Sequence, residues 1–221
     1  CERRTFGLGR ENDYHPEDLS YSDTGCPRYD VVFQGEKLCR VELKVAGSFN
    51  VINSLAAFAA AHVAGAPAGE IAASLSHFAG VHRRFEFTGL IDQVKMYHDY
   101  GHNPAEMRAA LSVARQQHPR RLWAVMQPHT YSRVKSLFQD YLTCTQIADY
   151  TLVTDIFAAR EKDPGDIKAE MIVEGMRAHG VDAVHTPAFD DAEAYLRAHW
   201  QPGDLVLTMG CGNINLLNEQ M

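Results

Sequence analysis

Apolar and polar residues alternate with two different rhythms along this chain of 221 residues. From about residue 90 onward, short apolar runs are each followed by a polar loop and then by apolar residues three and four positions apart. The short runs predict β-strands, and the wider spacing predicts helices with one apolar face. The expected strands are residues 94–98, 122–126, 150–154, 183–185 and 205–208, and the expected helices are residues 104–117, 132–147, 167–179 and 190–198.

Strands that alternate with helices are typical of βαβ units, in which parallel strands form one sheet between two layers of helices. Residues 122–126 and 205–208 are nearly all apolar, as expected for strands buried on both faces. The sequence therefore predicts an α/β fold with a Rossmann-like parallel sheet flanked by helices over residues 89–221, with a domain boundary near residue 88.

Residues 1–88 follow a different pattern. A polar, turn-rich segment comes first, then two predicted strands at residues 29–33 and 38–45, then two predicted helices at residues 47–65 and 67–78. Two apolar helices after a hairpin suggest the closing part of a domain. Two strands are too few to bury a sheet face, so they either join later strands or have partner strands upstream of residue 1, and we expect the second.

Polar side chains gather in the loops that follow three of the predicted parallel strands. These loops are residues 98–103, 127–133 and 155–161, and each carries His, Arg or Asp. Asn103, Pro104 and Glu106 further predict a helix start with a capping box directly after the first loop. Since the carboxyl ends of parallel strands lie at one edge of a sheet, we expect His102, His129 and Arg133 to converge there.

Arg83 and Arg84 allow two interpretations. They are either a solvated charge pair or a guanidinium clamp for phosphate, for which the planar fork of Arg is suited. The alternating residues 85–87 that follow predict a short strand. In an extended chain, adjacent side chains point to opposite sides, so at most one of the two arginines is expected to face a given site.

Composition and charge exclude several classes of protein. The net charge is −7 and no long basic run occurs, which argues against a nucleic-acid partner. No apolar run approaches the roughly 20 residues of a membrane span. The five cysteines are scattered and never spaced as C-x-x-C, which favours reduced thiols in a cytoplasmic protein and no metal site. They are Cys1, Cys26, Cys39, Cys144 and Cys211.

Five segments resemble, in the same order, motifs of the Mur ligase family, the ATP-dependent amide ligases of peptidoglycan precursor synthesis. GSFNVIN at residues 47–53 is similar to GxHNxxN, and RRFE occurs at residues 83–86. The three loops HDYGHNPAE, QPHTYSR and DIFAARE are similar to DDYxHHPxE, QPHxYSR and DIYxARE. Phe49, His98 and Asn103 depart from these motifs, and no GxxxxGK[ST] phosphate loop is present.

The resemblance implies roles for individual residues. Asn50 and Asn53 match positions that contact adenine, Arg84 matches a phosphate-clamping arginine, and Asp99 matches a carboxylate that reaches the ribose hydroxyls. The residues expected near the incoming amino acid and the acyl phosphate are Tyr100, His102, His129 and Arg133. Of these, the expected catalytic residues are His102, His129 and Arg133.

The resemblance also implies a reaction and a domain plan. L-alanine would be joined to UDP-N-acetylmuramate through an acyl phosphate, with ATP and Mg²⁺. Residues 1–88 would be the C-terminal part of the central ATP-binding domain, and residues 89–221 the C-terminal, amino-acid-binding domain. The remaining N-terminal and central segments of the same polypeptide are expected upstream as partners, so this chain alone is expected to be inactive.

Three alternatives remain open. The first is a ligase that attaches a recycled peptide to the same UDP-sugar, although QPHTYSR favours the alanine-adding reaction. The second is a non-catalytic nucleotide-binding module, which is favoured only by the missing phosphate loop. The third is an α/β domain with no site at all.

Overall fold

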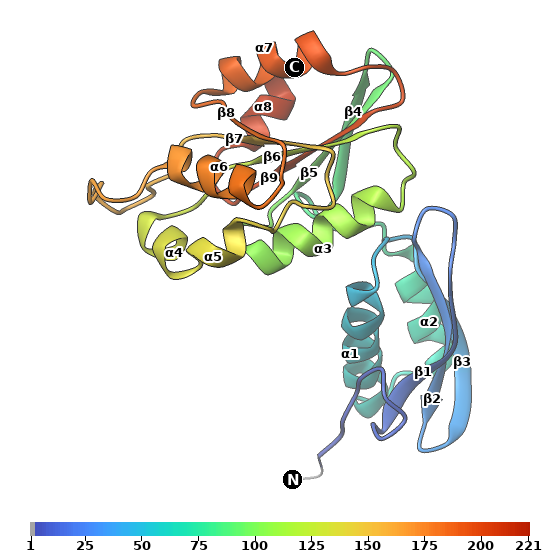
Figure 1. Cartoon of the computed structure of the whole chain (residues 1–221). Coiled ribbons are helices and arrows are strands. Elements are labelled where there is room, and N and C mark those ends of the chain that lie inside the picture. The colour runs from blue at the N-terminus through green and yellow to red at the C-terminus, as the bar shows by residue number, and fades with distance from the viewer. Residues whose placement is uncertain (1–2) are drawn as a thin grey trace. The chain divides into compact units, whose positions relative to one another are not determined.

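The structure is a computed structural model that describes residues 3–221. The chain forms two compact units, one ending at Gly80 and the other running from Val81 to Met221 (Figure 1). The boundary expected near residue 88 falls inside strand β4, Glu86–Ile91, which pairs with its neighbour in the second unit. No helix in the described part of the chain is both long and apolar enough to cross a membrane. The cysteines at 26, 39, 144 and 211 are free thiols, and Cys1 lies outside the described residues.

The first unit is a three-stranded antiparallel sheet with two helices packed on it. The elements are β1 Tyr14–Tyr21, β2 Pro27–Phe33, β3 Glu36–Glu42, α1 Phe49–Val63 and α2 Ala68–His77. We expected the partner strands to lie upstream of residue 1. This was wrong for β1, which comes from the polar, turn-rich segment at the start of this chain. Its alternation is hidden because only Tyr14 and His15 are buried while residues 18–21 face solvent.

The second unit is built on a six-stranded sheet, in the order β4-β5-β9-β6-β7-β8. The five parallel strands are β5 Val94–Asp99, β6 Leu122–Met126, β7 Tyr150–Val153, β8 Ala183–His185 and β9 Leu205–Met209. The predicted α/β fold with a parallel sheet is confirmed, and β4 adds an antiparallel strand at one edge. All residues of β6 and β9 are buried, as their apolar sequences predicted.

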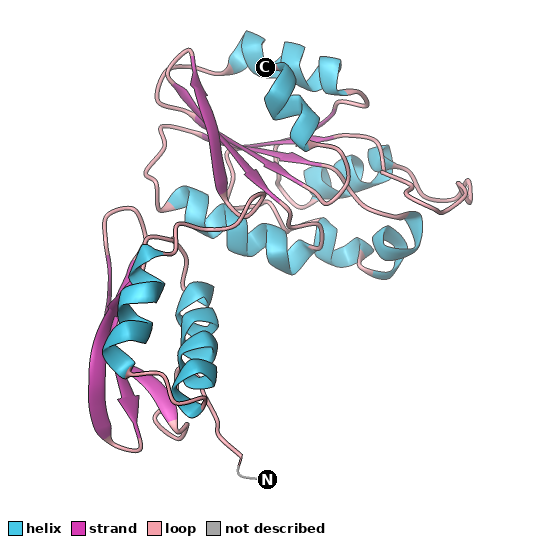
Figure 2. Cartoon of the chain, turned by 180° about the vertical axis from the view of Figure 1, so that it is seen from behind, coloured by secondary structure: helices cyan, strands magenta, loops and turns pink. Residues whose placement is uncertain are grey.

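Helices cover both faces of this sheet (Figures 1 and 2). Alternate residues of β6 divide between two cores: Leu122, Ala124 and Met126 pack with α3 and α6, while Trp123 and Val125 pack with α7 and α8. The alternation follows from the two-residue period of a strand. These helices are α3 Pro104–Arg115, α6 Ala169–Ala178, α7 Phe189–His199 and α8 Asn215–Gln220.

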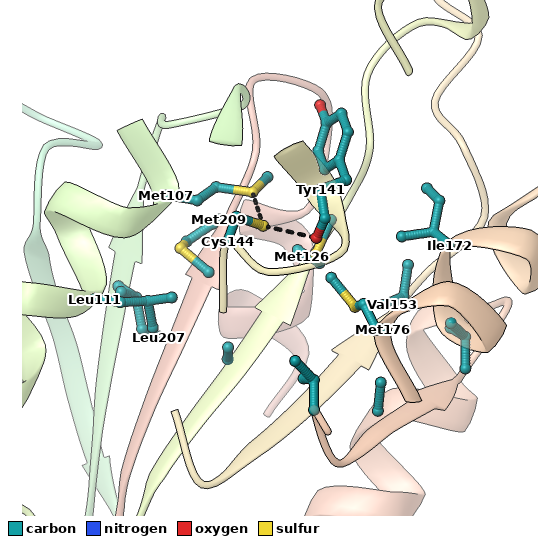
Figure 3. Packing of buried hydrophobic residues seen from close by; sticks show 14 of the residues in the cluster. Met107, Leu111, Met126, Tyr141, Cys144, Val153, Ile172, Met176, Leu207 and Met209 are labelled. Atoms are coloured by element: carbon teal, nitrogen blue, oxygen red, sulfur yellow. Dashed lines mark hydrogen bonds between the residues drawn. The ribbon is translucent and has the colours of Figure 1, made fainter. Parts of the chain in front are cut away.

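The long helix expected at residues 132–147 is wrong. The segment forms two short helices, α4 Tyr131–Ser136 and α5 Phe138–Tyr141, followed by turns. Leu137, between them, leaves the helical region with φ −112° and ψ 17°. The break lets Tyr141 and Cys144 enter the core beside Met107 of α3, where Figure 3 shows them close together.

Candidate functional site

Helix α3 begins at the end of β5 and determines the shape of the first polar loop. The side chain of Asn103 accepts a hydrogen bond from the backbone N–H of Glu106 over 3.0 Å, and Glu106 accepts in return from the N–H of Asn103. The predicted capping box is therefore confirmed, with Pro104 at the first helical position. It folds the loop back so that His102 stands at the start of the helix.

His102 is held in place by three polar contacts. Its Nδ1 lies 3.1 Å from the carbonyl oxygen of Tyr100 and 3.4 Å from the Glu106 carboxylate. Its own carbonyl oxygen accepts a hydrogen bond from the Tyr141 hydroxyl. Burial would raise the pKa of Glu106, but hydrogen bonds from the loop and the adjacent His102 ring outweigh burial, so that this pKa is lowered. Glu106 is therefore ionised beside His102 at neutral pH.

His129 and Arg133 come from the second loop and contact each other. An NH1 atom of Arg133 lies 3.1 Å from Nδ1 of His129, and the His129 ring lies edge-on to His102 with centroids 5.8 Å apart. Burial lowers the pKa of His129, and the neighbouring Arg133 and His102 side chains lower it further. The structure thus brings together the three side chains that were expected to meet at the carboxyl ends of the parallel strands.

The third loop contributes two supporting residues that the sequence did not single out. Phe157 stacks on the His129 ring with centroids 5.6 Å apart, and the two residues form an isolated β-bridge. Glu161 accepts hydrogen bonds from the backbone N–H and the hydroxyl of Ser132, at the start of the helix that carries Arg133. The ARE segment pointed to this loop but not to these contacts.

Arg83 and Arg84 both lie over the Tyr100 ring, at 4.9 and 5.4 Å from its centroid. The expectation that they face opposite sides was wrong because the backbone is not extended there: φ is +61° at Arg83 and +44° at Phe85. The Arg83 guanidinium is hydrogen-bonded within the protein. Arg84 is exposed and makes no side-chain hydrogen bond among the described residues.

Asp99 is 8% exposed and holds its own loop. One carboxylate oxygen accepts from the N–H of Gly101 over 2.6 Å, and the other accepts from the N–H of Phe85 over 2.8 Å. Burial raises its pKa, although these hydrogen bonds and Arg84 oppose the rise. The carboxylate therefore joins the segment of Arg84 to the end of β5.

Asn50 and Asn53 belong to the first unit. They lie one turn apart on α1, where Nδ2 of Asn53 donates to Oδ1 of Asn50 over 3.1 Å. Nδ2 of Asn50 donates to the carbonyl oxygen of Ala46, and Ser48, directly before the helix, makes no side-chain capping bond. The two carboxamides thus form one hydrogen-bonded pair near the start of the helix.

Comparisons with known proteins identify the family. The family model described as "Mur ligase, glutamate ligase domain" matches residues 83–212. The UDP-N-acetylmuramate–L-alanine ligase of Acetivibrio thermocellus is 37% identical over 220 residues, which cover 99% of this chain and 47% of that protein. The ligase of the same name from Clostridium perfringens is 37% identical over 219 residues, covering 99% and 48%. The chain thus spans about half the length of these relatives.

Solved structures show the same fold. The UDP-N-acetylmuramate-alanine ligase of Thermotoga maritima superposes with a TM-score of 0.82 at 24% identity, over 98% of this chain and 46% of that one. A murein peptide ligase of Psychrobacter arcticus gives a TM-score of 0.70 at 23% identity, over 99% and 45%. With its matching domain, its similar relatives and its cluster of His102, His129 and Arg133 at the end of a parallel sheet, the chain belongs to the Mur ligase family.

Proposed function

We propose that this chain forms part of an ATP-dependent ligase that joins L-alanine to UDP-N-acetylmuramate. The observation that carries the proposal is the contact of His102, His129 and Arg133, which come from two successive strand-to-helix loops. Relatives named for this reaction, at 37% identity over nearly the whole chain, support it. The chain covers only about half of their length, so the reaction is assigned to the full-length protein.

The proposed chemistry makes two demands on the site. The muramate carboxylate takes the γ-phosphoryl group of ATP to form an acyl phosphate, and the alanine amine then displaces phosphate through a tetrahedral intermediate. The amine must lose a proton to attack, and the negative charge that develops on oxygen must be stabilised. The three clustered side chains offer a carboxylate partner, a hydrogen-bond donor and a base for these tasks.

Arg133 is proposed to bind the carboxylate of L-alanine. Its guanidinium is planar and permanently charged, which suits a carboxylate. The side chain is half-buried beside His129 and Cys211, so its charge is less screened than on an open surface.

His129 is proposed to donate a hydrogen bond to the oxygen on which charge develops. The N–H groups of Arg133 can only donate, so Nδ1 of His129 must accept from NH1. A neutral His129 then carries its proton on Nε2. The lowered pKa of His129 keeps this neutral form at neutral pH.

His102 is proposed to accept the proton of the amine. Its Nδ1 faces the Tyr100 carbonyl oxygen and the ionised Glu106, both of which only accept hydrogen bonds. Nδ1 therefore carries the ring proton, and Nε2 has the free lone pair that a base needs. Glu106 fixes this tautomer and stabilises the imidazolium that forms, while Tyr100 is proposed to line the amino-acid site.

The remaining predicted residues are proposed to serve the nucleotide: Arg84 binding phosphate, Asp99 reaching the ribose, and Asn50 and Asn53 contacting adenine. Mg²⁺ is a separate matter. Among residues 3–221 no group of three His, Cys, Asp or Glu side chains could hold a metal ion. We therefore propose that Mg²⁺, like most of the ATP site, depends on segments that the relatives have and this chain does not span.

The test is the amino-acid dependence of the full-length protein. With UDP-N-acetylmuramate and ATP, we expect L-alanine to elicit release of ADP and phosphate together with an amide product. A tripeptide, tested as the recycled peptide, should not replace L-alanine. Turnover with the tripeptide and not with L-alanine would establish the recycling ligase instead. The absence of ATP hydrolysis with both would favour a nucleotide-binding module, and product formation by this chain alone would disprove its dependence on further segments.

A further inference from the structure

A hydrogen-bonded link through Arg83 connects the beginning of the second unit to the loop after β9. The Nε–H of Arg83 donates to Nε2 of His98 over 3.0 Å. Its NH2 group donates to the carbonyl oxygens of Gly210 and Gly212, over 3.3 and 3.0 Å. The same guanidinium lies over Tyr100. One side chain therefore contacts the end of β5 and the loop between β9 and α8.

The hydrogen bonds on the far side of His98 determine which ring nitrogen carries its proton. The Asn218 amide donates to the Thr88 hydroxyl over 2.9 Å, so its oxygen accepts from the hydroxyl of Thr208 at 2.6 Å. The only hydroxyl hydrogen of Thr208 is used in that bond. Thr208 therefore accepts a hydrogen bond from Nδ1–H of His98 over 2.9 Å. The lone pair on Nε2 of His98 is thereby left for the N–H of Arg83.

This link requires a neutral His98. The ring is 1% exposed, and burial, followed by the charge of Arg83, lowers the pKa of His98 to about 4. Of the other charged neighbours, Glu86 raises this pKa and His82 lowers it. The imidazole is therefore a stable acceptor for Arg83 at neutral pH.

The loop that Arg83 holds packs directly against the site. Gln127, at the end of β6, donates to the Asn213 side chain over 2.9 Å and accepts from the Asn213 N–H over 3.2 Å. A Cβ at Gly212 would lie 2.4 Å from Oε1 of Gln127 and 2.9 Å from Phe157. Phe157 in turn stacks on His129. A shift of this loop would therefore move the support under the His129 ring.

We propose that Arg83 is a positioning residue: by bridging His98 to the carbonyl oxygens of Gly210 and Gly212, it holds this loop against the His129 and Arg133 site. Cys211 lies between the two glycines and is half-buried, so the accessibility of its thiol reports on the position of the loop. The kinetic part of the test rests on the proposed function, whereas the accessibility of the Cys211 thiol does not.

The test is Arg83→Met in the full-length protein. Maleimide labelling of Cys211, followed by peptide mass spectrometry, should become at least fivefold faster. The KM for L-alanine should rise tenfold or more while that for UDP-N-acetylmuramate stays within twofold. Arg120→Met is the matched control, because it removes an arginine hydrogen bond to Asp204 at the other end of the strands. It should leave both readouts unchanged.

A pair of His98 variants keeps the proposal falsifiable if Arg83→Met does not fold. His98→Gln places a side-chain oxygen at the reach of Nε2 and can accept from Arg83. His98→Asn reaches only to the position of Nδ1, toward Thr208. We expect the Asn variant to show the faster Cys211 labelling and the raised KM for L-alanine of Arg83→Met. The Gln variant should match the unsubstituted protein in both readouts. Equal labelling of Cys211 in both would overturn the proposal, even if L-alanine proves not to be the substrate.

Discussion

The hydroxyl of Tyr141 donates a hydrogen bond of 2.8 Å to the backbone carbonyl oxygen of His102. Tyr141 is fully buried in the core on the α3 side of the sheet, beside Cys144 and Met107 (Figure 3). The loop that carries His102 is therefore tied to a core side chain. The geometry of the site therefore depends on the break between α4 and α5, which lets the Tyr141 ring enter the core.

Tyr141→Phe should lower both stability and activity. It removes the donor and leaves the His102 carbonyl oxygen without its partner, at a cost of about 1–2 kcal/mol in the free energy of unfolding. The freed loop should also reduce kcat. Urea unfolding and steady-state kinetics measure the two effects. Tyr195→Phe in α7 is the control, since its hydroxyl makes no hydrogen bond among the described residues. Equal stability of the two variants would contradict the role of Tyr141.

Arg133→Ala should mainly weaken the binding of L-alanine. The loss of its half-buried cationic partner costs the alanine carboxylate about 2–4 kcal/mol of binding free energy. The KM for L-alanine should therefore rise far more than that for ATP. Lys135→Ala is the control on the same helix, because Lys135 pairs with Asp166 at the surface. An unchanged dependence on L-alanine would remove Arg133 from the amino-acid site.

The sequence determined most of the second unit because its elements are locally encoded. Residues 122–126 and 183–185 are strands as predicted, and α3 starts at Pro104 because Asn103 and Glu106 form a local capping box. The long helix at residues 132–147 failed because apolar spacing alone does not distinguish one helix from two short ones joined at Leu137. The packing of Tyr141 under α3 is a tertiary effect that no local pattern contains.

The site was predicted where the parallel direction of the strands alone brings residues together. His102 follows β5, and His129 and Arg133 follow β6. The two strands are separated by β9, but in a parallel sheet their carboxyl ends still lie at one edge. Phe157 and Glu161 were missed because their contacts depend on the path of the third loop. The link from Arg83 to His98 was missed because it requires a positive φ at a non-glycine residue, for which the sequence carries no signal.

Asp99→Asn should disturb the nucleotide more than the amino acid. An amide has one acceptor oxygen, so one of the N–H groups of Phe85 and Gly101 would face an NH2 group instead. The loss costs about 1–3 kcal/mol of stability and loosens the segment of Arg84. The KM for ATP should rise while that for L-alanine changes little. The reverse pattern would show that the two binding regions have been exchanged.

The stability of the chain should fall between pH 6.5 and 4 because of His98. Its folded pKa of about 4 lies below the ordinary value of about 6.5, so in this range the unfolded chain binds a proton that the folded chain excludes. The shift corresponds to about 3 kcal/mol. His98→Gln should lack this loss. Asp99, whose pKa is raised, acts in the opposite direction in both proteins, so the difference between their urea-unfolding curves isolates His98.

Gly212→Ala should disrupt the site through one methyl group. The added Cβ would lie 2.4 Å from Oε1 of Gln127, which is buried and held by Asn213, and 2.9 Å from Phe157. Neither neighbour is free to move away, so the loop itself must shift, at a cost of about 1–3 kcal/mol. Because Phe157 stacks on His129, the KM for L-alanine should also rise. Gly89→Ala in β4 is the matched control, since its Cβ would meet no atom within 4 Å. If the two alanine variants were equally stable and equally active, the loop after β9 would not support the site.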